Sequence, residues 1–259
     1  MSQHQIEILL PHNLKELNLP MMVKNYPPHA RQGRESGLSY EEFLLGLTEA
    51  ELQSRAENRI KRRVREAHFP LMKTLEAFIY EAAPELDRRL IRELASGQYI
   101  RERKNVILTG KSGAGKTHLA IGLGMEACRQ GLSTRFVTGS ALANELIESC
   151  DEKKLSRTIQ RYSHYSLLII DELGYIPFSR QGAELLFQVL AERHERGSVI
   201  ITTNLGFSDW TQVFGDPILT TALLDRLTHK AHIITCSWES YRFKESLRHR
   251  QQNESLKKE

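Results

Sequence analysis

The stretch Gly110-Lys111-Ser112-Gly113-Ala114-Gly115-Lys116-Thr117 fits the phosphate-binding pattern G-x-x-x-x-G-K-[ST]. An apolar run at 106–108 precedes it, as expected for a buried strand, and a helical pattern begins at Thr117. The glycines let backbone N–H groups turn inward around a phosphate, and a helix N-terminus adds partial positive charge. With both flanks in place, an ordinary glycine-rich turn is the weaker interpretation. The sequence therefore predicts a nucleoside triphosphate site on a strand–loop–helix unit.

Two residues of this loop carry side-chain chemistry. Lys116 can reach the β- and γ-phosphates of a nucleotide, and the Thr117 hydroxyl can ligate Mg²⁺. The predicted nucleotide-binding residues are Gly110, Lys111, Ser112, Gly113, Ala114, Gly115, Lys116, Thr117 and His118.

A second motif follows about fifty residues later, where the aliphatic run 167–170 ends in Asp171 and Glu172. Asp171 would hold Mg²⁺ through water, so Thr117 and Asp171 are the predicted metal residues. Glu172 would polarise the attacking water as a general base. Four aliphatic residues before an Asp-Glu pair are a weak signal alone, but their order and distance after the P-loop strengthen it. The pair favours hydrolysis of ATP over phosphate transfer to a metabolite, and the predicted cofactors are ATP and Mg²⁺.

Two further polar residues complete the predicted catalytic set of Glu172, Asn204 and Arg226. Asn204 ends the aliphatic strand pattern 198–203; alone it could be a turn residue, but after the two motifs we interpret it as a γ-phosphate sensor. Arg226 lies on an amphipathic helix after Gly215-Asp216-Pro217. It could reach a neighbouring subunit's γ-phosphate as an arginine finger, or pair with a carboxylate of its own chain such as Asp225. The residues alone do not separate these two roles.

A basic segment occupies the second half of a helix predicted from Ser39 to about His68. Its cations are Arg55, Arg59, Lys61, Arg62, Arg63 and Arg65, with only Glu57 among them as an offsetting charge. At helical spacing one face is basic and another apolar, so the basic face could meet DNA phosphates. We expect these cations to lack acidic partners one helical turn away, which favours phosphate binding over a merely solvated face. The segment is therefore the predicted contact to duplex DNA.

Composition limits the class of protein. The 259 residues carry 36 Lys and Arg against 32 Asp and Glu, a net charge of +4, so bulk charge does not by itself indicate a nucleic-acid binder. Three widely spaced cysteines and no H-E-x-x-H pattern argue against a disulfide framework or a zinc site. No apolar run approaches the roughly 18 residues of a membrane helix. We expect a soluble cytoplasmic protein with no membrane partner.

The presence or absence of strand-like runs divides the chain into a helical domain, 1–69, and an α/β domain, 70–259. In the first, prolines at 11 and at 27–28 suggest breaks between short helices. In the second, helices are expected over 75–83 and 84–96, followed by strands that alternate with helices. The predicted strands are 106–108, 135–137, 167–170, 199–202 and 233–235, and the predicted helices between them include 142–150, 181–193 and 220–227. Such alternation indicates a parallel sheet covered on both faces.

With these residues assembled, the chain resembles the IstB family, helper ATPases encoded beside the IstA transposase in bacterial insertion sequences. The resemblance runs from about residue 14 to residue 245. Its most specific stretches are 110–117, 168–174, 202–210, 213–227 and the late Glu239-Ser240-Tyr241-Arg242. The family belongs to the AAA+ class and is related to the DnaC helicase loader and the DnaA initiator.

The resemblance implies a fold and a set of roles. It implies a P-loop AAA+ core with a five-stranded parallel sheet in the order 5-1-4-3-2, preceded by a small all-α domain. It also implies that Asn204 is the sensor-1 residue and that Arg226 is the finger arginine. Only about two dozen residues follow the fifth predicted strand, so we expect no C-terminal lid domain and no sensor-2 arginine.

The function expected from this resemblance is that of an ATP-dependent transposition helper. It would form a homo-oligomer on duplex DNA with ATP bound between subunits, recruit and stimulate a cognate IstA-type transposase, and disassemble on hydrolysis. The main alternative is a DnaC-like replicative helicase loader, which would bind a helicase through its N-terminal domain. A small-molecule P-loop kinase is disfavoured by Asp171, Glu172 and Asn204. A further alternative is a nucleotide-gated binding module that does not hydrolyse ATP. Measurable ATP turnover that is lost in Glu172→Gln would exclude it.

Overall fold

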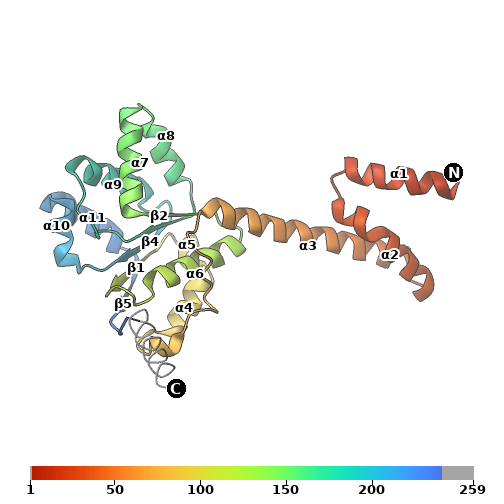
Figure 1. Ribbon diagram of the computed structural model, residues 1–259, viewed down its shortest axis with the longest axis horizontal. Helices are drawn as coiled ribbons and strands as arrows, with labels where there is room; N and C mark the ends of the chain where they lie inside the picture. The colour runs from red at the N-terminus through yellow and green to blue at the C-terminus, as the bar shows by residue number, and fades with distance from the viewer. Residues whose placement is uncertain (1, 241–259) are drawn as a thin grey trace, which may run out of the picture. The chain divides into compact units, whose positions relative to one another are not determined.

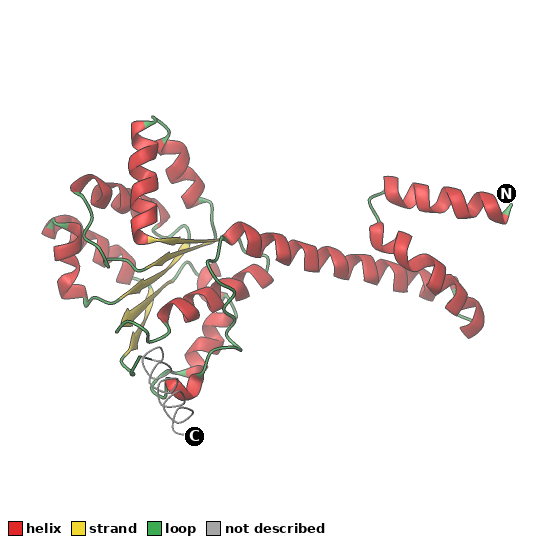
Figure 2. Cartoon of the chain, in the orientation of Figure 1, coloured by secondary structure: helices red, strands yellow, loops and turns green. Residues whose placement is uncertain are grey.

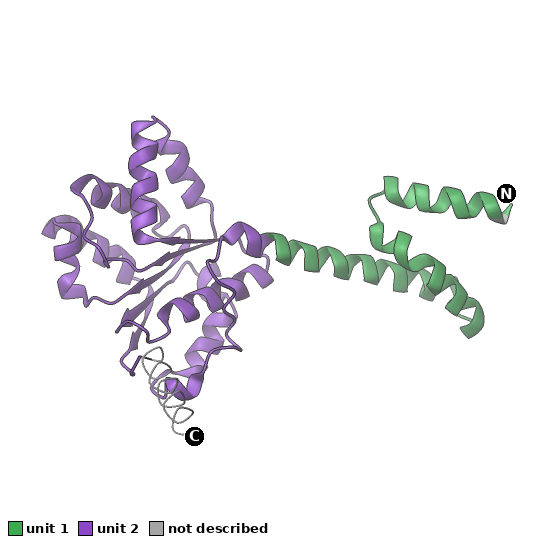
Figure 3. Cartoon of the chain, viewed as in Figure 1, with its two compact units in different colours: residues 1–62 green, residues 63–259 purple. Residues whose placement is uncertain are grey.

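The computed structural model describes residues 2–240 (Figure 1). The expectation that a lid and a sensor-2 arginine are missing concerns residues 241–259, which lie outside the described residues, as do Tyr241 and Arg242 of the late motif. Contacts divide the chain into two compact units, Met1–Arg62 and Arg63–Glu259 (Figure 3). The predicted boundary at 69/70 differs from this division by seven residues, because the helix that contains the basic segment contributes residues to both units.

A five-stranded sheet forms the centre of the second unit. Its strands are β1 (Asn105–Gly110), β2 (Thr134–Thr138), β3 (Leu167–Asp171), β4 (Ser198–Thr203) and β5 (Ala231–Cys236). Their order is β2-β3-β4-β1-β5 and every pairing is parallel, which confirms the predicted sheet. Because β1, β3 and β4 are adjacent, their carboxyl ends bring the P-loop and the polar ends of two other strands to the same edge.

Helices cover both faces of this sheet (Figure 2). Two helices, α4 (Arg88–Ala95) and α5 (Gln98–Arg101), precede the P-loop, and α6 (Lys116–Arg129) follows it directly. The rest of the unit supplies α7 (Gly139–Asp151), α8 (Leu155–Ser163), α9 (Arg180–Arg193), α10 (Trp210–Phe214) and α11 (Pro217–Thr228). Sequence analysis expected segments within α7, α9 and α11 but not the separate helices α8 and α10.

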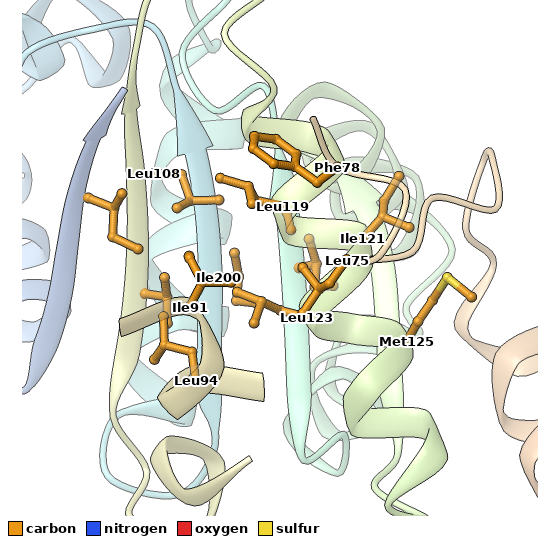
Figure 4. Packing of buried hydrophobic residues seen from close by; sticks show 14 of the residues in the cluster. Leu75, Phe78, Ile91, Leu94, Leu108, Leu119, Ile121, Leu123, Met125 and Ile200 are labelled. Atoms are coloured by element: carbon orange, nitrogen blue, oxygen red, sulfur yellow. The ribbon is translucent and has the colours of Figure 1, made fainter. Parts of the chain in front are cut away.

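Strand side chains alternate between two cores, as the two-residue period of a strand requires. Val106 and Leu108 of β1 belong to the core under α4 and α6, whereas Ile107 between them belongs to the core under α7 to α11. Figure 4 shows the first core, where Leu108 and Ile200 of the sheet lie opposite Leu119 and Leu123 of α6. The central strands β1, β3 and β4 are buried on both faces for most of their length, and their sequences accordingly contain continuous aliphatic runs.

The segment between Pro70 and α4 corrects one prediction. Residues 75–83 form no α-helix; they contain only the 3₁₀ turn Tyr80–Ala82. Leu75 and Phe78 are instead buried in the core beside α6, so tertiary packing overrides helix propensity. The Asp87 side chain accepts hydrogen bonds from the N–H groups of residues 89 and 90, so α4 begins at Arg88 and not at residue 84.

The first unit is helical, as expected. It comprises α1 (Gln3–Glu16), α2 (Pro20–Ser36) and the greater part of α3 (Tyr40–Ala67). Ser39 and Glu42 form a reciprocal capping box at the start of α3, which explains the predicted helix start. Within this unit Met22 and Leu47 are buried.

The prolines at 11, 27 and 28 do not mark helix ends in this unit, contrary to prediction. Pro11 lies inside α1, and prolines 27 and 28 lie inside α2. A proline has a helical φ and removes one N–H, and on a helix with solvent access water can satisfy the carbonyl that loses its partner. The break falls at 17–19 because Asn18 takes a φ of +56° and Pro20 occupies the first turn of α2, where its N–H is not needed.

Candidate nucleotide-binding site

The P-loop connects β1 to α6, as the sequence predicted. Three of its glycines have positive φ: 142° at Gly110, 80° at Gly113 and 88° at Gly115. A side chain at Gly115 would also be blocked, since its Cβ would lie 2.8 Å from Cε2 of Phe78. These positions therefore require glycine for both conformation and space.

Lys116 lies within the loop that it serves. It is 9% exposed, and its Nζ donates hydrogen bonds to the carbonyl oxygens of Gly110 at 2.6 Å and Lys111 at 2.8 Å. A buried ammonium group is costly unless it is paired or hydrogen-bonded, and these carbonyls supply part of that compensation. The arrangement places a cation at the centre of the phosphate-binding loop.

Thr117 and Asp171 are in direct contact. Thr117 Oγ1 donates to the carboxylate, with distances of 2.9 and 3.1 Å to its two oxygens. Thr202 Oγ1, from β4, lies 2.6 Å from Asp171 Oδ1 and donates to it. Asp171 is 5% exposed, so these two hydroxyls fix the orientation of a buried carboxylate.

Thr202, whose role was not predicted from the sequence, also holds the residue after Asp171 in place. Its Oγ1 accepts a hydrogen bond from the Glu172 backbone N–H at 2.9 Å. Glu172 adopts a φ of +54°, an uncommon conformation for a residue with a side chain. Thr202 therefore orients both acidic residues at the end of β3, and the signal in the sequence was a hydroxyl at the end of an otherwise aliphatic strand.

The donor set around Thr117 and Asp171 fits Mg²⁺. Both residues offer oxygen atoms, the ligands that this hard cation prefers. Between residues 2 and 240 no cluster of three or more His, Cys, Asp or Glu side chains could hold a metal by itself. That suits Mg²⁺ in a nucleotide site, where one or two protein ligands combine with phosphate oxygens and water.

A cavity of about 560 Å³ adjoins the loop and collects most of the predicted residues. Glu172 and Asn204 line it together with the P-loop residues 112–118. Asp171 lies behind Thr117, and Gly110 and Lys111 hold the Lys116 ammonium. The apolar part of the lining comes from Phe78, Ile79, Ala82, Ala83, Ile121 and Trp238. The cavity thus combines a polar end suited to phosphates with an apolar part suited to a base.

His118 follows Thr117 and is held by the segment before α4. Its Nε2 lies 2.8 Å from the carbonyl oxygen of Thr74, and its ring meets the Phe78 ring edge-on with centroids 5.2 Å apart. Burial lowers the pKa of His118, and the neighbouring Lys73 charge lowers it further, against the effect of the Thr74 hydrogen bond. His118 therefore links α6 to this segment through its ring contact with Phe78 and its hydrogen bond with Thr74.

Arg226 lies apart from the cavity of its own chain. Its guanidinium carbon is 4.8 Å from the centroid of the Phe187 ring of α9, and its Nη1 donates to the Ala222 carbonyl at 3.2 Å. Within residues 2–240 Arg226 forms no ion pair, with Asp225 or any other carboxylate. Arg226 is not among the residues that line the cavity. The intramolecular ion pair considered from the sequence is therefore absent from the described structure.

The six basic residues of α3 differ in their surroundings. Arg55 donates to Glu51 at 3.0 Å and Arg63 lies 3.7 Å from Glu66, so the expectation that all lack nearby acidic partners was wrong. The Arg63 side chain is 33% exposed and its Nε is buried. The Arg55 side chain is 51% exposed despite its pairing with Glu51, and the other exposed cations are Arg59, Lys61, Arg62 and Arg65. A basic surface on α3 would centre on these four.

Comparison with known proteins places this geometry in a family context. A family model described as IstB-like ATP binding protein matches residues 12–249. The chain is 39% identical over 242 residues to an ATP-binding protein of insertion sequence IS21 from Pseudomonas aeruginosa, covering 93% of this chain and 90% of that one. It is 38% identical over 229 residues to the corresponding protein of IS5376 from Geobacillus stearothermophilus, covering 88% and 91%.

Solved structures share the fold. A DnaC helicase loader matches with a TM-score of 0.50 at 20% identity, covering 57% of this chain and 86% of that one. AMPPCP-bound DnaA from Aquifex aeolicus matches with a TM-score of 0.54 at 20% identity, covering 70% and 56%. Together with the strand order, these likenesses establish an AAA+ P-loop fold. Among the described helices, none combines the length and apolar character that a bilayer crossing needs.

Proposed function

Because this chain belongs to the family of IstB-like ATP binding proteins, we propose that it is a Mg²⁺-dependent ATPase that assists transposition of an insertion sequence. The observation that carries this proposal is the cavity at the carboxyl edge of the sheet. Lys116, Thr117, Glu172 and Asn204 all line it, and Asp171 contacts Thr117 directly. A cation, a metal-ligand pair and an exposed carboxylate beside one phosphate-sized loop suit phosphoanhydride hydrolysis.

The residues divide the reaction as follows. The loop N–H groups and Lys116 bind the phosphates, while Thr117 and Asp171 hold Mg²⁺, which neutralises charge on the phosphate oxygens when bound. Glu172 orients a water molecule and accepts its proton, and Asn204 contacts the γ-phosphate or that water. Val106 to Leu108 and Leu167 to Ile170 are buried, so the two strands hold these groups on a rigid support.

A neighbouring copy of the chain completes the site in this proposal. Arg226 is remote from its own cavity and makes no ion pair within residues 2–240, so its guanidinium can serve the γ-phosphate of another subunit. ATP then stabilises a homo-oligomer, because the nucleotide lies between two subunits. Hydrolysis removes the γ-phosphate contact and drives disassembly.

The partners proposed are duplex DNA and a transposase encoded by the same element. Residues 1–69 act as the DNA- and partner-binding domain and residues 70–259 as the ATPase domain. Exposed cations of α3 contact DNA phosphates, and oligomerisation presents many copies of this surface to one duplex. The assembled protein then recruits and stimulates its cognate IstA-type transposase.

The deciding experiment measures duplex DNA binding and particle size with and without ATP. The parent should assemble on DNA only with ATP; Lys116→Ala should not assemble, and Glu172→Gln should stay assembled because it binds ATP without hydrolysing it. DNA binding that is indifferent to ATP and to both substitutions would refute the proposal. Pull-down against a replicative helicase tests the alternative of a DnaC-like loader, which would retain the helicase and not the transposase.

A further inference from the structure

The last residue of β5 and the segment after it, residues 236–240, lie directly against the P-loop. A Cβ at Gly110 would be 2.2 Å from the Cys236 carbonyl oxygen, and one at Gly113 would be 2.0 Å from Ser240 Oγ. Between these two contacts, Trp238 is 7% exposed and its indole Nε1 donates a hydrogen bond to the Ala114 carbonyl oxygen at 2.9 Å. The segment thus follows the loop along most of its length.

The hydrogen bond from Trp238 acts on one particular peptide unit. The Ala114 C=O and the Gly115 N–H belong to the same trans peptide, so they point in opposite directions. A phosphate-binding loop needs its N–H groups inward and its carbonyl groups outward, since a carbonyl dipole aimed at a phosphate repels it. The indole nitrogen is a donor only, so it can hold a carbonyl but not an N–H.

This peptide needs an external restraint because its flanks are conformationally permissive. Gly113 and Gly115 adopt positive φ on either side of Ala114, and glycine takes either sign of φ readily. Rotation of the Ala114–Gly115 peptide would turn the carbonyl inward and the N–H outward. Phe78 packs against Gly115 from another side, so this part of the loop lies between two aromatic side chains.

We propose that Trp238 is a positioning residue for the P-loop, whose indole N–H holds the Ala114 carbonyl outward and thereby aims the Gly115 N–H at bound phosphate. This rests on the proposed function, in which the loop binds ATP. The Trp238 ring also lines the cavity, but its indole N–H acts through Ala114 and Gly115, so loss of the N–H alone should affect phosphate binding and not base binding.

The chain offers a matched pair of variants for the test. It contains two tryptophans, and Trp210 is 2% exposed with an indole nitrogen that finds no hydrogen-bond partner within residues 2–240. Trp238→Phe and Trp210→Phe therefore make the same chemical change at two buried sites, but only the first removes a hydrogen bond to the P-loop. Binding of ATP and of inorganic tripolyphosphate, which has no base, is measured with the full chain.

We expect Trp238→Phe to raise the dissociation constants of ATP and tripolyphosphate by a similar factor, about fivefold, as loss of one hydrogen bond implies. The KM for ATP should rise with kcat within about twofold, and Trp210→Phe should leave both ligands at parental affinity. Parental tripolyphosphate affinity in a folded Trp238→Phe would overturn the inference, as would weakened ATP binding alone, since Trp238 would then act on the base. If the parent binds neither ligand, the proposed function fails as well.

A second measurement on the unmodified side chain covers the case in which Trp238→Phe does not fold. With ¹⁵N-labelled tryptophan, the Trp238 indole resonance is identified as the one that remains in Trp210→Phe. A peptide whose N–H donates to an anion becomes a better acceptor at its carbonyl, because linked hydrogen bonds polarise one another. Saturating tripolyphosphate should therefore move the Trp238 indole proton downfield and slow its exchange. An unchanged resonance would overturn the inference.

Discussion

Thr117 and Asp171 are 54 residues apart in the chain, yet the Thr117 hydroxyl donates to both oxygens of the Asp171 carboxylate, at 2.9 and 3.1 Å. The contact joins the first turn of α6 to the end of β3. A hydroxyl that offers its oxygen to a metal ion keeps its proton, so Thr117 can ligate a metal while it still donates to Asp171. The contact therefore holds together the two residues that we propose bind Mg²⁺.

Thr202 holds this arrangement from the neighbouring strand, so Thr202→Val should impair it. The substitution keeps the shape of the side chain but removes the donor to Asp171 and the acceptor of the Glu172 N–H. Leaving buried partners unsatisfied should lower the free energy of unfolding by about 1–3 kcal/mol. We expect Mg²⁺-dependent ATP hydrolysis to fall at least tenfold, measured as phosphate release at saturating ATP.

Thr203→Val is the matched control for that variant. Thr203 is also 1% exposed, but its Oγ1 accepts only from the Leu205 N–H, at 3.2 Å. Hydrolysis in Thr203→Val should stay much closer to that of the parent. Equal losses in the two variants would mean that Thr202 does not act through the acidic pair.

Arg226 should act on a neighbouring subunit. Arg226→Ala should bind ATP nearly normally but should hydrolyse it and assemble poorly, because in the proposed oligomer its guanidinium acts on the γ-phosphate of a neighbouring subunit. Mixed with Lys116→Ala, it should regain partial activity, since some interfaces then combine an intact Lys116 site with an intact Arg226. ATP hydrolysis is followed across mixing ratios. No recovery at any ratio would argue for a role within one chain.

A second prediction about the same proposed interface concerns Phe187, which should orient Arg226. The Arg226 guanidinium lies over the Phe187 ring, so Phe187→Leu should leave the arginine present but poorly oriented. A Phe187→Leu/Lys116→Ala chain has no working site of its own, so when it is mixed with Arg226→Ala only its finger contributes to hydrolysis. Activity should then fall below that of Lys116→Ala mixed with Arg226→Ala. Equal activity in the two mixtures would show that the cation–π contact does not position Arg226.

Much of the core could be predicted because its signals are local. The P-loop residues 110–117 and the run 167–172 each lie within one strand and the turn after it, so residues that are close in the sequence are also close in the fold. The alternation of aliphatic strands with helices then predicts a parallel sheet, and the family resemblance supplies its order. The same reasoning places Asn204 at the carboxyl edge of the sheet, beside the two motifs, since β4 lies between β3 and β1.

The missed features depend on contacts between distant segments. Residues 75–83 have a helical pattern, but Phe78 is fixed by packing against Gly115 and His118, which lie beyond β1. Trp238 contacts Ala114 across 124 residues, and nothing in the local sequence of either marks the partner. Arg55 has an acidic residue one turn earlier, at Glu51, so that pairing was visible in the sequence and was overlooked.

Glu51 should make the first unit sensitive to acid. Its carboxylate accepts from the N–H groups of Met21 at 2.8 Å and Met22 at 3.3 Å, and from Arg55 Nε at 3.0 Å. Burial raises the pKa of Glu51, but these hydrogen bonds more than offset it and the pKa lies below its ordinary value. A carboxyl with a lowered pKa stabilises the fold above its unfolded pKa, and that stabilisation is lost as the pH falls toward the folded pKa.

The window for this effect therefore begins at about pH 4.3 and extends downward. Far-UV circular dichroism of the full chain should show helix loss in this range that is absent in Glu51→Gln, which should already be less stable at pH 7. Glu57→Gln, an exposed position on the same helix, is the control and should follow the parent. Parent and Glu51→Gln curves that coincide at every pH would remove Glu51 from the account.

The basic face of α3 gives the last prediction. Arg59 and Arg62 are exposed. Arg55 is exposed as well, but it contacts Glu51 and donates to the Asn18 carbonyl. If exposed cations contact DNA phosphates, Arg59→Ala and Arg62→Ala should each weaken duplex binding equally across sequences. Each should also reduce the slope of log K against log salt by about one. ATP binding should not change, because Lys116 and the cavity residues belong to the other unit.

Arg55→Ala is the matched control on the same helix, with the same loss of one charge. It should lower the stability of the first unit, since Glu51 and the Asn18 carbonyl lose a partner, but change the salt slope less than Arg59→Ala does. Fluorescence anisotropy of labelled duplexes at several salt concentrations measures both quantities. In an oligomer each loss is repeated in every subunit on the same DNA, so even single changes should be readily measurable. If changing Arg59, Lys61, Arg62 and Arg65 together leaves affinity and salt slope at parental values, α3 presents a solvated surface and the DNA contact lies elsewhere on the chain.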